Sequence, residues 1–325
     1  MDRIELCLQK YRKWCRNIGI STVSDLNRII EDGEVNYLVN VSEIWHEQNI
    51  SEIANYIRNN IDTKKLILIS GPSSSGKTSF ANRLKLHLKV SGVNAVSISL
   101  DNYYLPREQI PPGSDGKPDY EIPEALDLER FNRNISDLIE GREVIMPIYS
   151  FGYRPNSEYS LSLFENDVII VEGLHALNPV IAGDLPLYNK YKIYCSALTA
   201  LTNDDGSKIR SRTNRLIRRL IRDYSFRNST PEFTFDIWQN VEQSAAKYIF
   251  PFTDEADVVF NSSLLYEFSV YKKHILKLLT DYDGQTGMEH KDEILNLMDK
   301  VIGIDDAYVP GSSLVREFIG GSSVI

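Results

Sequence analysis

Residues 71–78 read GPSSSGKT and place a glycine- and serine-rich loop and one lysine directly after an aliphatic segment. They match the pattern G-x-x-x-x-G-K-[S/T], and the amphipathic segment that follows supplies the helix that this pattern requires. Backbone N–H groups of such a loop point inward and bind phosphate at the helix N-terminus. Lys77 then reaches the β- and γ-phosphates of a nucleotide, and the Thr78 hydroxyl ligates Mg²⁺. We therefore predict a nucleotide site formed by this phosphate loop, namely Gly71, Ser73, Ser74, Ser75, Gly76, Lys77, Thr78 and Ser79.

Two carboxylates stand where other predicted strands end. Glu172 closes the aliphatic segment VIIVEG (168–173), and a carboxylate at this place beside a phosphate loop holds Mg²⁺ directly or through water. Asp101 follows the segment 94–99 and is expected to lie beside the phosphate loop. An acid there could accept the proton of an attacking hydroxyl, although aspartate is also a common turn or cap residue.

Arginines recur in the segment RSRTNRLIRRLIRDYSFR (210–227) at helical spacing. Arg215, Arg218, Arg219 and Arg222 fall on one face of the predicted helix. A stripe of like charge costs stability unless acids or anions answer it. A salt-bridged surface helix is one interpretation; in an acidic chain with a phosphate loop we favour a lid that presents arginines to a transferring phosphate.

The overall composition narrows the class of protein and its partners. Among 325 residues, 45 Asp and Glu outnumber 36 Lys and Arg, and the formal net charge is −9. This acidic balance disfavours nucleic acid as a partner. No apolar run approaches the roughly 18 residues that cross a bilayer, and the N-terminal residues lack the apolar core of a signal peptide. With three unclustered cysteines, these features predict a cytoplasmic protein that binds no membrane.

Short aliphatic segments alternate with amphipathic ones from residue 64 onward, which predicts parallel strands covered by helices. The predicted strands are 65–70, 94–99, 167–173, 190–196 and 256–261. Residues 143–151 and 158–164 alternate in hydropathy and lie close together, so we expect a β-hairpin annex. The predicted fold class is α/β, a doubly wound parallel sheet.

Helical periodicity through residues 1–62 predicts an N-terminal helical appendage. We therefore divide the chain into this appendage, a main α/β domain at 63–283, and a C-terminal helix and tail at 284–325. In the tail, residues 309–325 indicate at most one short strand.

The chain resembles the uridine kinase and phosphoribulokinase family of P-loop kinases. The resemblance runs from about Leu66 to about Leu279 and rests on motifs in a fixed order: GPSSSGKT, SLDNYY, PEALDLERFN, MPIYSF, VIIVEG, RLIRRLIRDYSFR and FPFTDEADVVFNS. It is closest to a bacterial subgroup of uridine-kinase-like proteins, to judge from ISTVSDLN, SEIWHEQNISEIA, IYCSALTALTNDD and REFIGGSS. In longer members of that subgroup the kinase follows a region similar to the N-terminal part of threonyl-tRNA synthetase. This chain would then be a fragment or a naturally short relative.

The resemblance implies a nucleoside kinase that uses ATP and Mg²⁺. Asp101 would take the proton from the sugar 5′-hydroxyl, and Thr78 and Glu172 would hold Mg²⁺. Arg222, as a catalytic residue, and Arg227 would approach the phosphates. Matched to acceptor-binding positions are Tyr104, Glu121, Tyr149 and Arg219. The family also implies a homo-oligomer, either a dimer or a tetramer.

Two departures from the family concern recognition of the base and the lid. Uridine kinases carry a histidine after the motif similar to MPIYSF, where GYRPN (152–156) offers Arg154 as the candidate substrate residue. The second arginine of the family's R-G-R lid is absent from RNS (227–229).

We expect transfer of the ATP γ-phosphoryl group to the 5′-hydroxyl of a nucleoside, uridine- or cytidine-like, by in-line displacement. Another small acceptor, such as phosphoribulose or pantothenate, is the first alternative. A phosphorylated acceptor would favour basic residues in the substrate loop, yet residues 111–124 supply only Lys117 among four acids. The second alternative is an ATP-dependent regulatory module without a metabolic acceptor.

Overall fold

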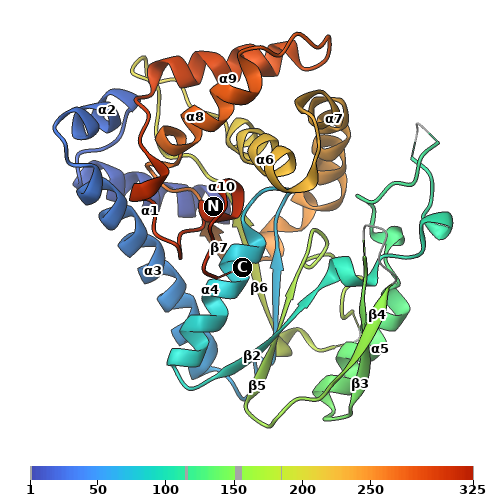
Figure 1. The fold of residues 1–325 in the computed structure, drawn as a ribbon. Coiled ribbons are helices and arrows are strands. Elements are labelled where there is room, and N and C mark those ends of the chain that lie inside the picture. The colour runs from blue at the N-terminus through green and yellow to red at the C-terminus, as the bar shows by residue number, and fades with distance from the viewer. Residues whose placement is uncertain (1, 114–115, 151–155, 184, 325) are drawn as a thin grey trace.

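The computed structural model describes residues 2–113, 116–150, 156–183 and 185–324. Within these residues a parallel sheet of five strands has the order β2–β5–β1–β6–β7 (Figure 1). Its strands are β1 (Leu66–Ser70), β2 (Asn94–Ser99), β5 (Asp167–Glu172), β6 (Lys190–Ser196) and β7 (Val258–Asn261). The predicted doubly wound α/β fold is confirmed, and each predicted strand agrees with the observed one to within two residues.

Both faces of the central strand β1 are buried, which is why its sequence is aliphatic throughout. Ile67 and Ile69 point into a hydrophobic cluster shared with α1, α3, α4, α6 and α8. Leu66 and Leu68 point into the opposite cluster, beneath α5 and the end of α7. The sheet therefore separates two hydrophobic layers and holds its strand ends in fixed register.

Helices flank the sheet on both sides (Figure 1). They are α1 (Arg3–Asn17), α2 (Val23–Glu31), α3 (Val35–Asn59), α4 (Lys77–Val90), α5 (Leu128–Ile139), α6 (Ser211–Arg227), α7 (Pro231–Tyr248), α8 (Glu267–Leu279), α9 (Met288–Lys300) and α10 (Arg316–Ile319). No helix among the described residues is long and apolar enough to cross a membrane.

The predicted hairpin annex is present as a separate antiparallel pair. Strands β3 (Val144–Ile148) and β4 (Ser157–Leu161) pair from Val144↔Leu161 to Ile148↔Ser157. Figure 1 shows the pair at the lower right, beside α5. The hairpin thus extends the side of the molecule that carries the end of β2.

The N-terminal helices pack directly on the α/β part of the chain, and α3 runs alongside α4 in Figure 1. The Tyr11 hydroxyl of α1 donates to the carbonyl of Ser263 at 2.8 Å. On α3, the His46 ring bonds the carbonyl of Asn261 at 2.9 Å. The division of the chain at residues 62 and 283 stays a prediction; buried contacts continue across the first boundary.

The C-terminal segment contradicts the expectation of a short strand. Among described residues 309–324 there is no strand, and the short helix α10 lies there instead. Leu314, Val315 and Phe318 are fully buried in the cluster that holds α6. These apolar residues follow helical spacing, but four residues of helix give too weak a periodicity to identify from sequence.

Helix α6 is anchored by a buried ion pair of Arg218, one of the four arginines of the predicted stripe. The Arg218 and Glu267 side chains are both 0% exposed, and Arg218 Nη2 lies 2.6 Å from Glu267 Oε2. Arg218 also donates to the hydroxyl and carbonyl of Ser262, at 3.0 and 2.8 Å. Arg218 therefore holds α6 to α8. Its side chain is buried and cannot form part of a lid that faces solvent.

We predict that Arg218→Met lowers the free energy of unfolding by about 3–5 kcal/mol, because it leaves the Glu267 carboxylate buried without its cation. Urea unfolding at neutral pH measures this loss. The control is Arg133→Met, whose partner Glu129 lies at 3.6 Å on an exposed face. It should change stability by less than about 0.5 kcal/mol. Equal effects of the two substitutions would contradict the assignment.

Candidate active site

The phosphate loop connects β1 to α4 and takes a backbone conformation that turns its N–H groups inward. Ser74 and Gly76 have positive φ values of 60° and 83°. A Cβ on Gly71 would lie 2.0 Å from the carbonyl oxygen of Cys195 in β6. Glycine at 71 is therefore required by the close approach of β6, and glycine at 76 by the backbone turn that forms an anion-binding concavity.

Lys77 points back over the loop that precedes it. Its ammonium donates to the carbonyl of Gly71 at 2.8 Å. Burial lowers the pKa of Lys77, while the nearby Glu172 carboxylate opposes the shift. The lysine is thus held at the mouth of the concavity, where its positive charge would neutralise the phosphate that it is predicted to bind.

Thr78 and Glu172 meet at the end of two adjacent strands. Glu172 pairs with Ile69 in the register of β5 and β1, which brings its carboxylate to the start of α4. The Thr78 hydroxyl lies 3.5 Å from Glu172 Oε2. A hydroxyl and a carboxylate suit Mg²⁺, which keeps several waters and takes further oxygens from substrate phosphates. Among the described residues no group of three or more His, Cys, Asp or Glu side chains forms a complete cage for a metal.

Asp101 follows β2 on a short 3₁₀ turn, Leu100–Tyr103. Its carboxylate faces the same cleft as Lys77. The surrounding protein desolvates this carboxylate and raises its pKa, and the charges of Lys77, Arg227 and Arg222 oppose that rise. A carboxylate with a raised pKa and an open face has the properties of a general base.

These groups line one cleft of about 730 Å³, within the usual range for small-molecule sites. Its walls come from the phosphate loop, the turn after β2, the end of β5, α6 and the start of α7, with one residue from α10. Predicted residues lining it are Ser73, Ser74, Ser75, Gly76, Lys77, Thr78, Asp101, Tyr104, Glu121, Glu172, Arg219, Arg222 and Arg227.

The arginines of α6 divide into those that reach the cleft and those that do not. Arg219 lines the cleft and donates to the Ser73 hydroxyl at 2.8 Å. Arg215 does not line the cleft: it pairs with Glu242, lies 5.3 Å from the centre of the Trp238 ring, and donates to the carbonyl of Ser73 at 3.3 Å. With Arg218 also turned into the core, the predicted stripe is wrong as a single phosphate-facing surface.

Asp223 explains how three arginines can converge on the cleft. This carboxylate is 4% exposed and lies 3.1 Å from Arg219 Nε. Its other oxygen lies 2.9 Å from Arg222 Nη2 and 3.5 Å from Arg227 Nη1. One buried acid therefore offsets part of the repulsion within the arginine cluster and holds its guanidinium groups in place.

Comparison with known proteins agrees with this geometry. The model of the phosphoribulokinase / uridine kinase family matches residues 66–185. The uridine kinase of Macrococcus caseolyticus is 30% identical over 195 residues, which cover 60% of this chain and 86% of that protein. Over the same length the uridine kinase of Staphylococcus carnosus is also 30% identical and 85% covered. That of Ureaplasma parvum is 27% identical over 175 residues, covering 54% of this chain and 76% of its own.

This chain belongs to the phosphoribulokinase / uridine kinase family. Membership makes it a kinase that transfers a phosphoryl group to an alcohol acceptor, with a small molecule as substrate. The observed meeting of the phosphate loop, Asp101 and Glu172 in one cleft is the arrangement that such a transfer needs.

The other predicted residues of the kinase that the structure describes lie around the cleft. Tyr149 lines an adjoining hollow of about 500 Å³, and Tyr104 lines both spaces, with its ring 5.7 Å from that of Tyr149. Gly71 lies beneath the loop against β6. Ser79 is buried in the first turn of α4. Arg154 lies outside the described residues.

Sequence analysis missed several residues that line the kinase cleft. They are Tyr120, Gly173, Leu174, Asp223, Ser229, Phe233 and Glu317. Asp223 carried a signal, because it interrupts the arginine run and is spaced to face Arg219 and Arg227 at i−4 and i+4. Glu317 lies in REFIGGSS, a segment that carried the resemblance, but no spacing pointed it to the cleft, since 238 positions separate it from Ser79, the residue it contacts.

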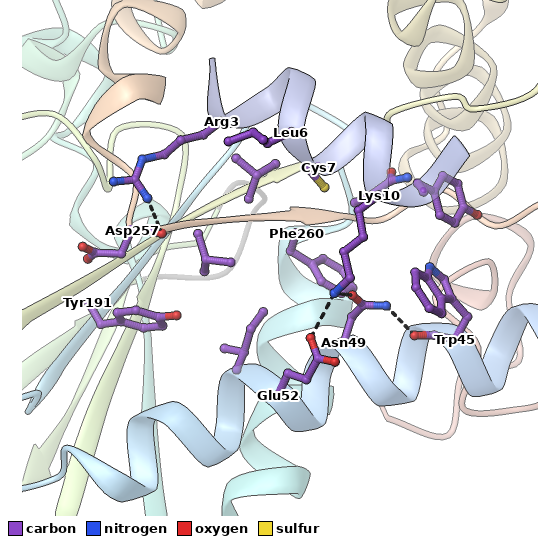
Figure 2. Close-up of a pocket in the computed structure, with 15 residues that line it drawn as sticks. Arg3, Leu6, Cys7, Lys10, Trp45, Asn49, Glu52, Tyr191, Asp257 and Phe260 are labelled. Carbon is purple, nitrogen blue, oxygen red and sulfur yellow. Dashed lines mark hydrogen bonds and ion pairs between the residues drawn. The ribbon is translucent and has the colours of Figure 1, made fainter. Parts of the chain in front are cut away.

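A second cavity of the kinase, of about 360 Å³, lies between α1, α3 and the edge strand β7 (Figure 2). Its two cations have partners within the protein. Arg3 donates to the carbonyl of Asp257 at 2.5 Å, and Lys10 bonds Asn49 and Glu52, each at 3.0 Å. We therefore assign phosphate chemistry to the cleft and not to this cavity.

Gly71→Ala should disrupt the kinase by forcing the phosphate loop away from β6. The added Cβ meets a backbone oxygen at 2.0 Å, and no side chain can give way there. We expect turnover to fall by about a hundredfold, the effect of a displacement of about 1 Å at a catalytic site. Steady-state kinetics measures this. Gly303→Ala is the control, since its nearest atom lies at 3.6 Å, and a comparable loss there would contradict the explanation.

Proposed function

We propose that this kinase transfers the γ-phosphoryl group of Mg·ATP to the 5′-hydroxyl of a uridine- or cytidine-like nucleoside. The observation that carries the proposal is that Asp101 and Lys77 face one cleft together with three arginines of α6, namely Arg219, Arg222 and Arg227. The relatives named uridine kinases support the choice of a nucleoside, because the chain covers most of their length.

In the proposed reaction the acceptor hydroxyl attacks the γ-phosphorus in line with the leaving oxygen of ADP. Asp101 takes the hydroxyl proton as the new O–P bond forms and the bond to ADP breaks. Lys77, Arg222 and Arg227 neutralise charge on the transferring group and on the leaving phosphate. Bound Mg²⁺, held by Thr78 and Glu172, would supply further charge neutralisation at the β- and γ-phosphates.

The acceptor is proposed to lie toward Glu121, Tyr104 and Tyr149, away from the phosphate loop. Burial raises the pKa of Glu121, and the neighbouring Arg219 opposes this rise. The carboxylate can accept hydrogen bonds from sugar hydroxyls, and the tyrosine rings offer surfaces for a base. Acids on this side of the cleft favour a neutral acceptor over a phosphorylated one.

Three properties stay predictions from the sequence. They are the homo-oligomer, the cytoplasmic location, and the similarity to relatives that carry a region like threonyl-tRNA synthetase.

The test is ADP release from Mg·ATP with a panel of ribo- and deoxyribonucleosides, ribulose 5-phosphate, pantothenate, or no acceptor. We expect one pyrimidine nucleoside to give fast release and a 5′-monophosphate. Fast release with ribulose 5-phosphate or pantothenate would overturn the nucleoside assignment. Equal slow release with every acceptor would favour the regulatory module.

Asp101→Asn should lower the turnover number by about 10²–10⁴-fold, because the amide cannot take the proton. The Kd of Mg·ATP, measured by calorimetry, should stay unchanged within about twofold, since Asp101 is proposed to contact the acceptor hydroxyl and not the nucleotide. The control, Asp236→Asn, removes an exposed carboxylate of α7 that does not line the cleft. Turnover that survives Asp101→Asn would remove Asp101 as the base.

The pH profile of the turnover number gives an independent check. Asp101 acts when ionised, so activity is lost as the pH falls through its pKa. Because burial raises that pKa, we expect this loss at a pH above the range of an ordinary aspartate. The residual activity of Asp101→Asn should lack the same acidic limb. An identical limb in that variant would assign the titration to another group.

A further inference from the structure

A carboxylate from the C-terminal segment lies at the first turn of the phosphate-loop helix. The Ser79 hydroxyl donates to Glu317 Oε2 at 2.5 Å. The backbone N–H of Ser79 donates to the same oxygen at 3.3 Å. Both donors of this buried residue are therefore directed at one acidic oxygen.

These donors belong to the predicted nucleotide site. Ser79 is the third residue of α4, where backbone N–H groups have no partner within the helix and the helix dipole favours an anion. A carboxylate oxygen and a phosphate oxygen make the same kind of charge-assisted hydrogen bond to such donors. Glu317 thus accepts the bonds that we expect a nucleotide phosphate to accept.

The backbone that carries Glu317 is firmly held. Leu314 packs against Gly76, with a side-chain atom 2.9 Å from the place a Cβ would take. Phe318 is fully buried, and its ring centre lies 5.0 Å from the Arg218 guanidinium carbon. Arg316 donates to the carbonyls of Asp306 and Val309. The carboxylate can leave Ser79 by rotation of its own side chain, without movement of α10.

Charges lining the cleft give Glu317 an electrostatic effect as well. Its described lining holds the acids Asp101, Glu121, Glu172, Asp223 and Glu317, against the cations Lys77, Arg219, Arg222 and Arg227. A nucleotide phosphate brings more negative charge to a lining that already has one acid in excess. Repulsion from Glu317 therefore adds to its occupation of the Ser79 donors.

We propose that Glu317 sets the nucleotide affinity of this kinase by competing, within the chain, for the phosphate position at Ser79. Binding of a nucleoside triphosphate or diphosphate then requires the Glu317 carboxylate to release Ser79. The result is weaker binding of both nucleotides and faster release of the diphosphate. The inference rests on the proposed nucleotide site, but not on the identity of the acceptor.

The test is the Kd of Mg·ATP and of inorganic pyrophosphate, measured by calorimetry without any acceptor. Glu317→Gln keeps the shape of the side chain and removes its charge. We expect this variant to bind both ligands about tenfold more tightly, the size of one charge-assisted hydrogen bond. The matched control is Glu289→Gln, which neutralises an exposed acid of α9 away from the cleft and should leave both Kd values unchanged.

A double-mutant cycle with Ser79→Ala tests the route of the competition. If Glu317 acts through Ser79, the gain from Glu317→Gln shrinks when the serine hydroxyl is absent. Unchanged or weaker binding by Glu317→Gln, with the melting temperature preserved, would overturn the proposal and leave the proposed kinase reaction intact. Absence of binding by every variant would instead overturn the nucleotide site itself. Failure of the acceptor panel has no effect on these Kd values.

Discussion

Pairing of buried arginines is the constraint on which the site depends. Helix α6 carries several guanidinium groups into the protein, and each needs a carboxylate because an unpaired buried charge is costly. Glu267 takes Arg218 and Glu242 takes Arg215, so these two hold the helix. Asp223 holds the other arginines on the side of the cleft. The distribution of acids thus decides which arginines serve packing and which face the cleft.

The phosphate loop depends equally on segments far from it in sequence. Gly71, at the start of the loop, lies against the carbonyl of Cys195 in β6. Gly76 packs against the Leu314 side chain of the C-terminal segment. Arg219 of α6 donates a hydrogen bond to the hydroxyl of Ser73. A local motif supplies the turn and its donors, while three distant elements fix the position of that turn.

How well the sequence predicts each part follows from the range of the interaction involved. Glu172 and Asp101 could be placed because the carboxyl ends of parallel strands meet at one edge of a sheet, where β5 pairs with both β1 and β2. The inward turn of Arg218 could not be foreseen, since its partner Glu267 lies on a different helix and nothing in the spacing names it. Helical periodicity predicts that arginines share a face of the helix, but the tertiary contacts determine which groups that face packs against.

The contact between Ser79 and Glu317 spans 238 positions of the chain. During synthesis the phosphate loop and the β1 strand emerge from the ribosome long before α10 exists. A nascent chain can therefore form much of the sheet while its loop still lacks both the apolar cover of Leu314 and the carboxylate at Ser79. Under the proposed competition, the nucleotide affinity would reach its final value only after residue 317 has left the exit tunnel.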